Sequence, residues 1–277
     1  IFCVPGAGAS VISFEELARA LGREWPIYGL QPRGIDGRLI PHSTVSSAAE
    51  SYVRAITQVQ PEGPVHLLGH SFGGWVVFEM AQRLRAAGRT VVSLTIIDSE
   101  VPDGDQGREY TDTEVFVELV KVFEQYAASS LEITSRDLEL RDESARLGLL
   151  HEQLMRVGII PQRSNAEVLR GPVRTFAACL RTHYQPEGIY PGLLRIVLVD
   201  DSNLDDKANQ RRYEQHIAGW RRWAPDIIAW HGPGNHMTVL KPPHVYNVAT
   251  WLSLGLERGY TQAPICDQDG RKELIHE

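Results

Sequence analysis

VHLLGHSFGGWVVFEM, residues 65–80, passes from an apolar run typical of a buried strand to a pattern with helical periodicity. Between the two lies Gly69-x-Ser71-x-Gly73, which leaves no room for a loop. A strand that turns into a helix within about two residues forces the residue at the tip into a strained backbone conformation. Glycine at positions 69 and 73 removes the Cβ atoms that would collide as the helix passes over the strand. The sequence therefore predicts a sharp turn that presents the hydroxyl group of Ser71.

This turn makes Ser71 a candidate nucleophile. The N–H group of Phe72, in the first turn of the helix, would point toward the atom that Ser71 attacks, and the helix dipole would favour an oxyanion there. The G-x-S-x-G pattern alone is weak, because a chain of this length and glycine content contains it by chance in roughly one case in ten. The alternative is an ordinary Gly/Ser turn. The strand before it and the helix after it favour the nucleophile elbow.

Composition restricts the class of protein. A chain of 277 residues with 43% hydrophobic residues can bury a large core, and one α/β domain with an insertion fits this size. The net charge of −7, with acidic and basic residues interspersed, argues against a nucleic-acid groove. No segment has the roughly 18 apolar residues of a membrane span, and no signal peptide is visible. The chain opens in an apolar run without Met, so we expect a piece of a longer polypeptide or a processed protein.

The three cysteines are Cys3, Cys179 and Cys266, which are far apart and odd in number. No C-x-x-C motif is present. This usage predicts reduced thiols in a cytoplasmic protein, with neither a disulfide framework nor a zinc site.

Outside the middle of the chain, strand-like and helix-like runs alternate. Apolar runs typical of strands lie at residues 1–4, 26–30, 65–69, 91–97, 194–199 and 227–230. Helical patterns lie at residues 14–21, 43–59 with Ser43 as the cap, 72–87, 207–223 and 244–256, and the charged run 207–223 is expected to be exposed. This alternation predicts an α/β fold with a mostly parallel, doubly wound sheet, in which functional groups gather at the carboxyl ends of the strands.

The pattern changes between residues 103 and 187, where helix-period runs follow one another without a strand-like run. We therefore predict one domain over residues 1–277, with a core of residues 1–102 and 188–258, a helical insertion of about 103–187 and a polar tail of 259–277. Because the insertion interrupts the sheet, we expect it to form a mobile lid over the site.

A serine hydroxyl needs a base that removes its proton, and the base needs an acid that fixes its tautomer. Among ten histidines, His236 is the best candidate base, because it lies in a Gly/Pro loop past the last strand. His231, at the end of that strand, and His244, at the start of a helix, remain alternatives. His66 lies within a strand, and His70, next to the serine, is expected to pack or to bond locally.

Two positions are candidates for the acid. Asp98 follows the strand 91–97, whereas Asp200 and Asp201 follow the strand 194–199. The loop of residues 5–10, after the first strand, contains two glycines that let the backbone approach a ligand closely, so it is a candidate source of a second oxyanion N–H. The alternative for this loop is a plain strand-to-helix turn.

Five runs together resemble the chain-terminating (type I) thioesterase domains of nonribosomal peptide synthetases and polyketide synthases, which belong to the α/β-hydrolase superfamily. These runs are FCVPGAG at 2–8, YGLQPRG at 28–34, GHSFGG at 69–74, LTIIDS at 94–99 and GNH at 234–236. The resemblance covers most of the chain outside the lid and the tail, and it implies an α/β-hydrolase fold.

The resemblance also implies a Ser-His-Asp triad whose acid follows the earlier strand, 27 residues after the serine, which is the spacing between Ser71 and Asp98 here. It therefore favours Asp98 over Asp200 and Asp201, which lie in an acid-rich turn. By the same match the second oxyanion N–H is that of Gly6, with Ala7 as the alternative if the loop is offset by one residue.

The reaction implied by the resemblance begins when Ser71 takes a peptidyl or acyl chain from the phosphopantetheine thiol of a carrier domain. Water then hydrolyses the acyl-enzyme, or an internal amine or hydroxyl cyclises the chain. No metal and no permanently bound cofactor are implied, because the phosphopantetheine belongs to a carrier domain upstream in the same polypeptide. We expect a monomeric domain without nucleic-acid or membrane partners.

Three alternatives stay open. A stand-alone editing (type II) thioesterase usually uses the later acid position. A general serine esterase or lipase would act on free esters, but the HGGG-type loop of that group is missing here. A binding module on the same fold would usually have lost one residue of the triad.

Overall fold

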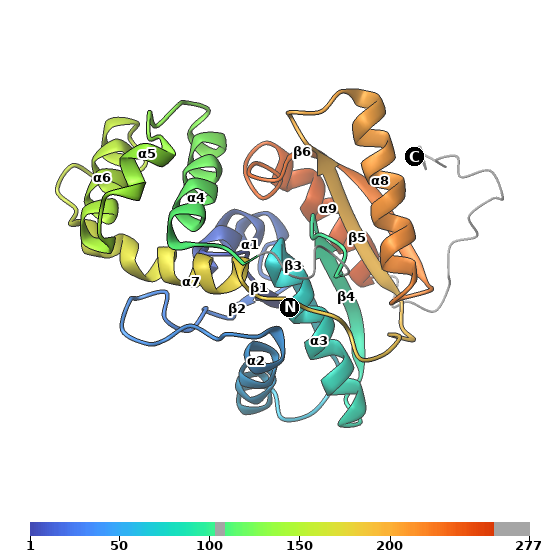
Figure 1. The fold of residues 1–277 in the computed structure, drawn as a ribbon. Helices are drawn as coiled ribbons and strands as arrows, with labels where there is room; N and C mark the ends of the chain where they lie inside the picture. The colour runs from blue at the N-terminus through green and yellow to red at the C-terminus, as the bar shows by residue number, and fades with distance from the viewer. Residues whose placement is uncertain (103–108, 258–277) are drawn as a thin grey trace.

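The computed structural model describes residues 1–102 and 109–257, which form a six-stranded parallel sheet with helices on both faces (Figure 1). The strands are β1 (Phe2–Val4), β2 (Tyr28–Gly29), β3 (Val65–His70), β4 (Val91–Ile97), β5 (Leu194–Asp200) and β6 (Ile227–Asn235). Their order across the sheet is β2-β1-β3-β4-β5-β6, and every neighbouring pair is parallel. The predicted α/β class is confirmed. The strand order reverses direction between β1 and β3, where such sheets bind their ligands.

The helices that cover the sheet are α1 (Glu15–Leu21), α2 (Val45–Val59), α3 (Phe72–Ala86), α8 (Asp206–Arg221) and α9 (His244–Glu257), and a 3-10 turn (Val11–Phe14) precedes α1. Helix α2 begins one residue later than expected, because Thr44 rather than Ser43 is its cap and accepts a hydrogen bond of 3.1 Å from the Ser47 N–H. Among the helices of the described residues, none is long and apolar enough to cross a membrane.

Each face of the sheet has its own apolar core, because alternate residues of a strand point to opposite faces. Leu67 and Ile96 pack with α2, α3 and α8 on one face. Their neighbours Leu68 and Ile97 pack with α1 and α9 on the other face. The central strands are therefore buried on both sides, which explains their continuous apolar sequences.

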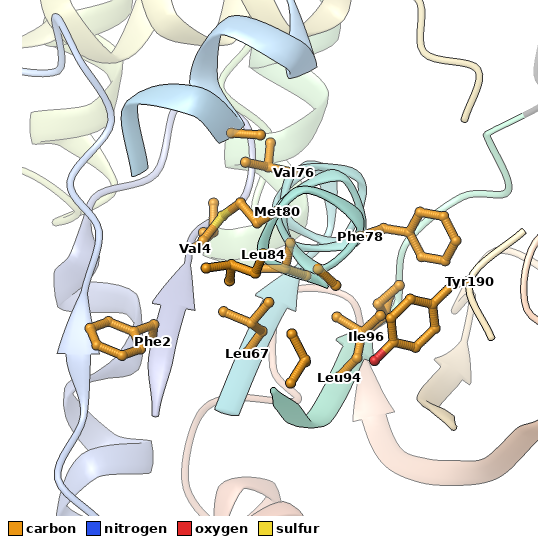
Figure 2. Packing of buried hydrophobic residues seen from close by; sticks show 14 of the residues in the cluster. Phe2, Val4, Leu67, Val76, Phe78, Met80, Leu84, Leu94, Ile96 and Tyr190 are labelled. Atoms are coloured by element: carbon orange, nitrogen blue, oxygen red, sulfur yellow. The ribbon is translucent and has the colours of Figure 1, made fainter. Parts of the chain in front are cut away.

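Helix α3 packs on the central strands β1 and β3. Figure 2 shows Val76, Met80 and Leu84 of this helix next to Val4 and Leu67 of the strands. All five side chains are buried. The helix that follows Ser71 is thus fixed against the middle of the sheet.

Glycine permits this close approach. A Cβ atom at Gly73 would collide with the carbonyl oxygen of Val4, and one at Gly69 would collide with the backbone of Gly73. Neither obstacle is a flexible side chain that could turn away. The predicted reason for glycine at both positions is confirmed.

Between β4 and β5 the described residues contain helices and no strand, and Figure 1 shows them to one side of the sheet. These helices are α4 (Asp112–Ala127), α5 (Ser135–Glu139), α6 (Glu143–Arg156) and α7 (Arg170–Leu180), with a 3-10 turn (Ala166–Leu169) before α7. They share a separate apolar core that includes Phe116, Leu150 and Phe176. The part of the predicted insertion that the structure describes is helical, whereas residues 103–108 and the predicted tail 259–277 lie outside the described residues. The role of this insertion as a lid stays a prediction.

Strand β6 is longer than the sequence indicated. It continues from Trp230 through the Gly/Pro run to Asn235, because its pairing with β5 continues across a shift of register and joins Asn235 to Asp200. His231 therefore lies inside the strand rather than at its end, and His236 follows the strand directly. The glycines that suggested a loop accommodate the irregular pairing, with Gly234 at φ 79°.

Gly73→Ala tests the contact between α3 and the strands. We expect it to lower the free energy of unfolding by about 2–4 kcal/mol, because the backbone of Val4 cannot move without disturbing β1. Gly148→Ala is the matched control: nothing lies near its added Cβ, so in helix α6 it should stabilise by up to ~1 kcal/mol. Denaturant unfolding of both variants measures the difference. Equal stabilities would contradict the account of the contact.

Candidate active site

Ser71 has the strained backbone that its position predicts, with φ 53° and ψ −128°. Hydrogen bonds hold it there. Its N–H donates to the Ile97 carbonyl at 2.9 Å, and its own carbonyl accepts from the Gly74 N–H at 2.8 Å and from the Ser99 hydroxyl. Residues of β4, of helix α3 and of the loop after β4 thus maintain a conformation that an isolated turn would avoid.

Two backbone segments border the serine. Helix α3 begins at Phe72, and the first N–H groups of a helix have no partner within the helix. From the other segment, the loop after β1, a Cβ atom at Gly6 would come within 3.0 Å of the Ser71 Cβ. Ala7 of this loop lines the cavity that contains Ser71, whereas Gly6 lines a separate cavity of about 40 Å³.

His236 and Asp98 form the pair that the sequence favoured. The Nδ1 atom of His236 lies 2.7 Å from Oδ2 of Asp98, whose side chain is 2% exposed. Asp98 follows β4 with φ 45°, and its N–H donates to the Val197 carbonyl at 2.7 Å. A carboxylate accepts hydrogen bonds, so the contact assigns the proton to Nδ1 and leaves Nε2 of the neutral ring as a proton acceptor.

The surroundings of Asp98 favour its charged form. Burial raises the pKa of Asp98, but the hydrogen bond from His236 and the positive charges of His236 and Arg212 outweigh burial and hold the pKa below its usual value. Nη2 of Arg212 lies 3.3 Å from Oδ1, the oxygen that His236 does not use. Both oxygens of this buried carboxylate therefore have a polar partner.

His70 packs against His236, as the expected local role requires. The two rings are stacked with their centroids 4.9 Å apart, and Nε2 of His70 lies 3.2 Å from the carbonyl oxygen of His236. Burial and the neighbouring His236 lower the pKa of His70 to about 3. His70 is consequently neutral near pH 7 and supports the ring of His236 without adding a charge.

The alternative acid and base pair with each other. Nε2 of His231 lies 2.7 Å from Oδ1 of Asp200, and both side chains are at least one-third exposed. Asp201 accepts hydrogen bonds from Asn203 in a surface turn. The described residues that line the cavity around Ser71 include none of His231, Asp200 and Asp201.

The other two histidines considered as alternatives, His66 and His244, also lie elsewhere. His66 contacts the Ser93 hydroxyl at 2.9 Å within the sheet. The ring of His244 lies against Gly234 at the start of α9, where a Cβ on Gly234 would meet it at 2.7 Å. The structure therefore brings Ser71, Asp98 and His236 to one cavity and separates the alternatives from it.

This cavity has a volume of about 970 Å³, near the upper end of the range for ligand pockets. Its walls combine aromatic and aliphatic side chains with polar ones. From the insertion and the segment after it come Tyr110, Phe176, Cys179, Leu180, Thr182, His183, Tyr184 and Gln185, and from α3, the loop after β4 and α8 come Trp75, Glu100, Val101, Gln215, His216, Gly219 and Arg222. Such a lining suits a bound molecule that carries both apolar and polar groups.

Two observations bear on metals and thiols. Within residues 1–102 and 109–257, no group of three or more His, Cys, Asp or Glu side chains could hold a metal ion. Cys3 and Cys179 are free thiols, and burial raises the pKa of each to about 12. Cys266 lies outside the described residues.

Sequence reasoning missed the polar residues behind Asp98. Helix α8 was expected to be exposed, but His216 and Trp220 are buried and Arg212 is partly buried. No feature of the sequence distinguishes Arg212 from its neighbour Arg211, which is exposed. Position alone, at the carboxyl end of β4 and β5, gives Arg212 its contact with Asp98.

Known proteins resemble this chain in sequence and in fold. A family model described as the thioesterase domain matches residues 1–252. Chondramide synthase of Chondromyces crocatus is 27% identical over 272 residues, which are 93% of this chain and 7% of that protein. Vanchrobactin synthetase of Vibrio anguillarum is 30% identical over 258 residues, which are 93% of this chain and 8% of that protein. The chain thus spans a small part of the curated relatives it matches.

Solved structures resemble this fold as well. A four-domain nonribosomal peptide synthetase bound to AMP and glycine gives a TM-score of 0.77 at 18% identity, with coverage of 94% of this chain and 19% of that chain. The RedJ thioesterase of the prodiginine pathway in Streptomyces coelicolor gives 0.62 at 20% identity, with coverage of 92% and 88%. At these identities the likeness shows the fold, which is the predicted α/β-hydrolase fold.

Two partly buried histidines, His66 and His70, make the stability of the fold depend on pH. Burial lowers the pKa of His66 to about 4 and that of His70 to about 3, whereas histidine in an unfolded chain titrates near 6.5. Below about pH 6.5 the unfolded chain therefore binds more protons, and His70 removes up to ~1.4 kcal/mol of stability per pH unit as the pH falls toward its folded pKa. The contribution of His66 is smaller, because solvent screens it more. Urea unfolding of His70→Gln between about pH 4.5 and 7 should show a shallower loss than the parent. An unchanged slope in both His70→Gln and His66→Gln would contradict the assignment.

Proposed function

Because the chain belongs to the thioesterase domain family, we propose that it releases a peptidyl or acyl chain from a carrier domain of a nonribosomal peptide synthetase. One of the two relatives described above is named a synthase and the other a synthetase, and the chain matches a small part of each. The observation that carries the proposal is the hydrogen bond of 2.7 Å between His236 and Asp98, in the cavity that also contains Ser71. Fold likeness alone would not support an activity.

The first half-reaction in this proposal acylates Ser71. Its Oγ attacks the carbonyl carbon of the thioester while Nε2 of His236 takes the hydroxyl proton. The tetrahedral intermediate then collapses, the C–S bond breaks, and the proton on Nε2 passes to the departing thiolate. Asp98 keeps the imidazole in the required tautomer and stabilises its charged form.

The second half-reaction removes the chain. Nε2 of His236 accepts a proton from water, or from an amine or hydroxyl within the chain, as that group attacks the ester carbonyl. The bond to the Ser71 oxygen breaks, and that oxygen regains a proton from His236. Water gives a free acid, whereas an internal nucleophile gives a lactam or lactone.

Two N–H groups are proposed to stabilise the oxyanion. Phe72 contributes the first, from the N-terminus of α3. For the second, the resemblance favours Gly6, but the lining of the cavity by Ala7 supports the neighbouring residue instead. Either donor belongs to the same loop after β1, which lies against the serine.

Helix α7 and the segment after it supply one wall of the cavity, so the insertion is proposed as a lid that controls the entry of water and of the chain. The phosphopantetheine belongs to the carrier domain, which we place upstream in the same polypeptide, and the thioesterase itself needs no permanently bound cofactor. The free thiols of Cys3 and Cys179 agree with a cytoplasmic location, and we propose that the domain is monomeric.

A stand-alone editing thioesterase is the principal alternative. It would be favoured if Asp200 or Asp201 supplied the acid. Instead Asp200 pairs with His231 on the surface, whereas Asp98 pairs with His236. We therefore favour chain release.

His236→Ala should reduce the turnover of a peptidyl pantetheine thioester by about 10³-fold or more, because proton transfer fails in both half-reactions. His231→Ala is the matched control: it also loses a hydrogen bond to an aspartate, but it should change turnover little. Ser71→Ala should abolish acyl-enzyme formation and leave the fold intact. A larger loss in His231→Ala than in His236→Ala would show that the base is wrongly assigned.

Asp98→Asn should lower turnover by about 10⁴-fold, because the imidazole loses the carboxylate that orients it. Asp200→Asn and Asp201→Asn should have mild effects. Each variant is assayed with a long peptidyl thioester and with an acetyl thioester of pantetheine. Chain release predicts a preference for the long substrate, and an essential Asp200 or Asp201 together with a preference for acetyl would identify an editing enzyme.

A further inference from the structure

The described residues place a polar cluster behind Asp98, on the side away from His236. Arg212, in the middle of α8, directs Nη2 to Oδ1 of Asp98 at 3.3 Å and Nη1 to the carbonyl oxygen of Val199 at 2.9 Å. The second contact fixes the guanidinium on the end of β5, the strand next to Asp98 in the sheet. Two donors of one planar group therefore span the ends of two neighbouring strands.

Glu100 contacts the guanidinium of Arg212 as well, and His216 contacts Glu100. Oε1 of Glu100 lies 3.5 Å from Nη2 of Arg212, and Oε2 lies 3.0 Å from Nε2 of His216, an ion pair when that histidine is protonated. Nδ1 of His216 lies 2.9 Å from the carbonyl oxygen of Arg212, one helical turn earlier. The backbone of Glu100 is fixed in turn, because its carbonyl accepts a hydrogen bond of 2.8 Å from Nε1 of Trp75.

From this arrangement we propose that Arg212 is a positioning residue, which holds Oδ1 of Asp98 so that Oδ2 faces His236. The inference rests on the proposed roles of Asp98 and His236. An aspartate side chain can turn about its terminal bond, and a carboxylate with one partner is free to rotate away from the imidazole. The Arg212 contact removes that freedom, because the guanidinium itself is tied to Val199 and Glu100.

Charge gives Arg212 a second effect on the same carboxylate. The charged and titratable groups that face Asp98 are His70 from β3, His236 after β6, Arg212 from α8 and Glu100 two residues along the chain. Arg212 is permanently cationic and lies between the two acidic groups. Without Arg212, Asp98 would lose a favourable charge and would face the Glu100 carboxylate with no cation between them, so protonation of Asp98 would begin at a higher pH.

The test compares Arg212→Met with Arg211→Met, which removes an exposed arginine one position earlier on the same helix. The readout is the rate of labelling of Ser71 by a fluorophosphonate between about pH 5 and 9, with thioester turnover as a second measure. We expect Arg212→Met to lower both rates by about 10- to 100-fold, as for other outer partners of a histidine–carboxylate pair. The acid limb of its pH profile should also move to higher pH, whereas Arg211→Met should match the parent.

Arg212→Lys separates charge from geometry. It should keep the acid limb near that of the parent, because the positive charge remains, and it should recover part of the rate. Thermal unfolding of each variant identifies a loss that comes from misfolding, and a stably folded Arg212→Lys keeps the test decisive if Arg212→Met does not fold. A shift of the acid limb is not expected from a structural defect alone.

The outcomes distinguish this inference from the proposed function. If the parent protein is not labelled at Ser71, the proposed function fails. If the parent is labelled and the Arg212 variants keep the parent's rate and pH profile, the positioning role of Arg212 alone is wrong. A fall in rate with no change in the acid limb of Arg212→Met would also contradict the inference.

Discussion

The close passage of helix α3 over the ends of β1 and β3 is the constraint on which the rest of the structure depends. Glycine at 69 and 73 allows the helix to begin against the strand backbone, and Ser71 takes up the resulting strain at φ 53°. The strain is balanced by bonds from β4 and from Ser99, so the turn cannot relax without disturbing the centre of the sheet. The same geometry places Ser71 at the carboxyl end of the central strand β3, where the strand order reverses. The close packing of α3 on the strands therefore both makes the scaffold rigid and exposes the candidate nucleophile.

The carboxyl end of the sheet holds two aspartate–histidine pairs, and their surroundings differ. His231 and Asp200 pair across neighbouring strands in an exposed position, where such a contact is worth little. Asp98 and His236 pair where the carboxylate is almost fully buried and has a cation on its second oxygen. Burial makes the geometry of the second pair specific, because a buried carboxylate must satisfy both oxygens locally. The two pairs have the same distance of 2.7 Å, but only the buried pair has a fixed geometry.

The sequence predicted the sheet and the elbow because these depend on local patterns, namely apolar runs and glycine spacing. The preference for Asp98 came from the family resemblance, since order along the chain alone left Asp200 and Asp201 open. It placed the end of β6 too early, since the Gly/Pro run resembles a loop until its pairing with β5 is known. It also treated α8 as an exposed charged helix. The contacts of Arg212 and His216 with residues near Asp98 join segments more than 100 residues apart, and no local pattern records them. The choice between Gly6 and Ala7 likewise depends on the path of a loop, where one residue changes the result.

The central claim is that the elbow presents Ser71 as a nucleophile, and its most direct test is to locate the covalent bond. After reaction with an alkyl fluorophosphonate, trypsin releases the peptide of residues 55–83, in which Ser71 is the sole serine. The account predicts one phosphonyl adduct, found on this peptide by mass spectrometry and lost when Ser71 is replaced by alanine. An adduct on a different peptide, or undiminished labelling of the alanine variant, would contradict it.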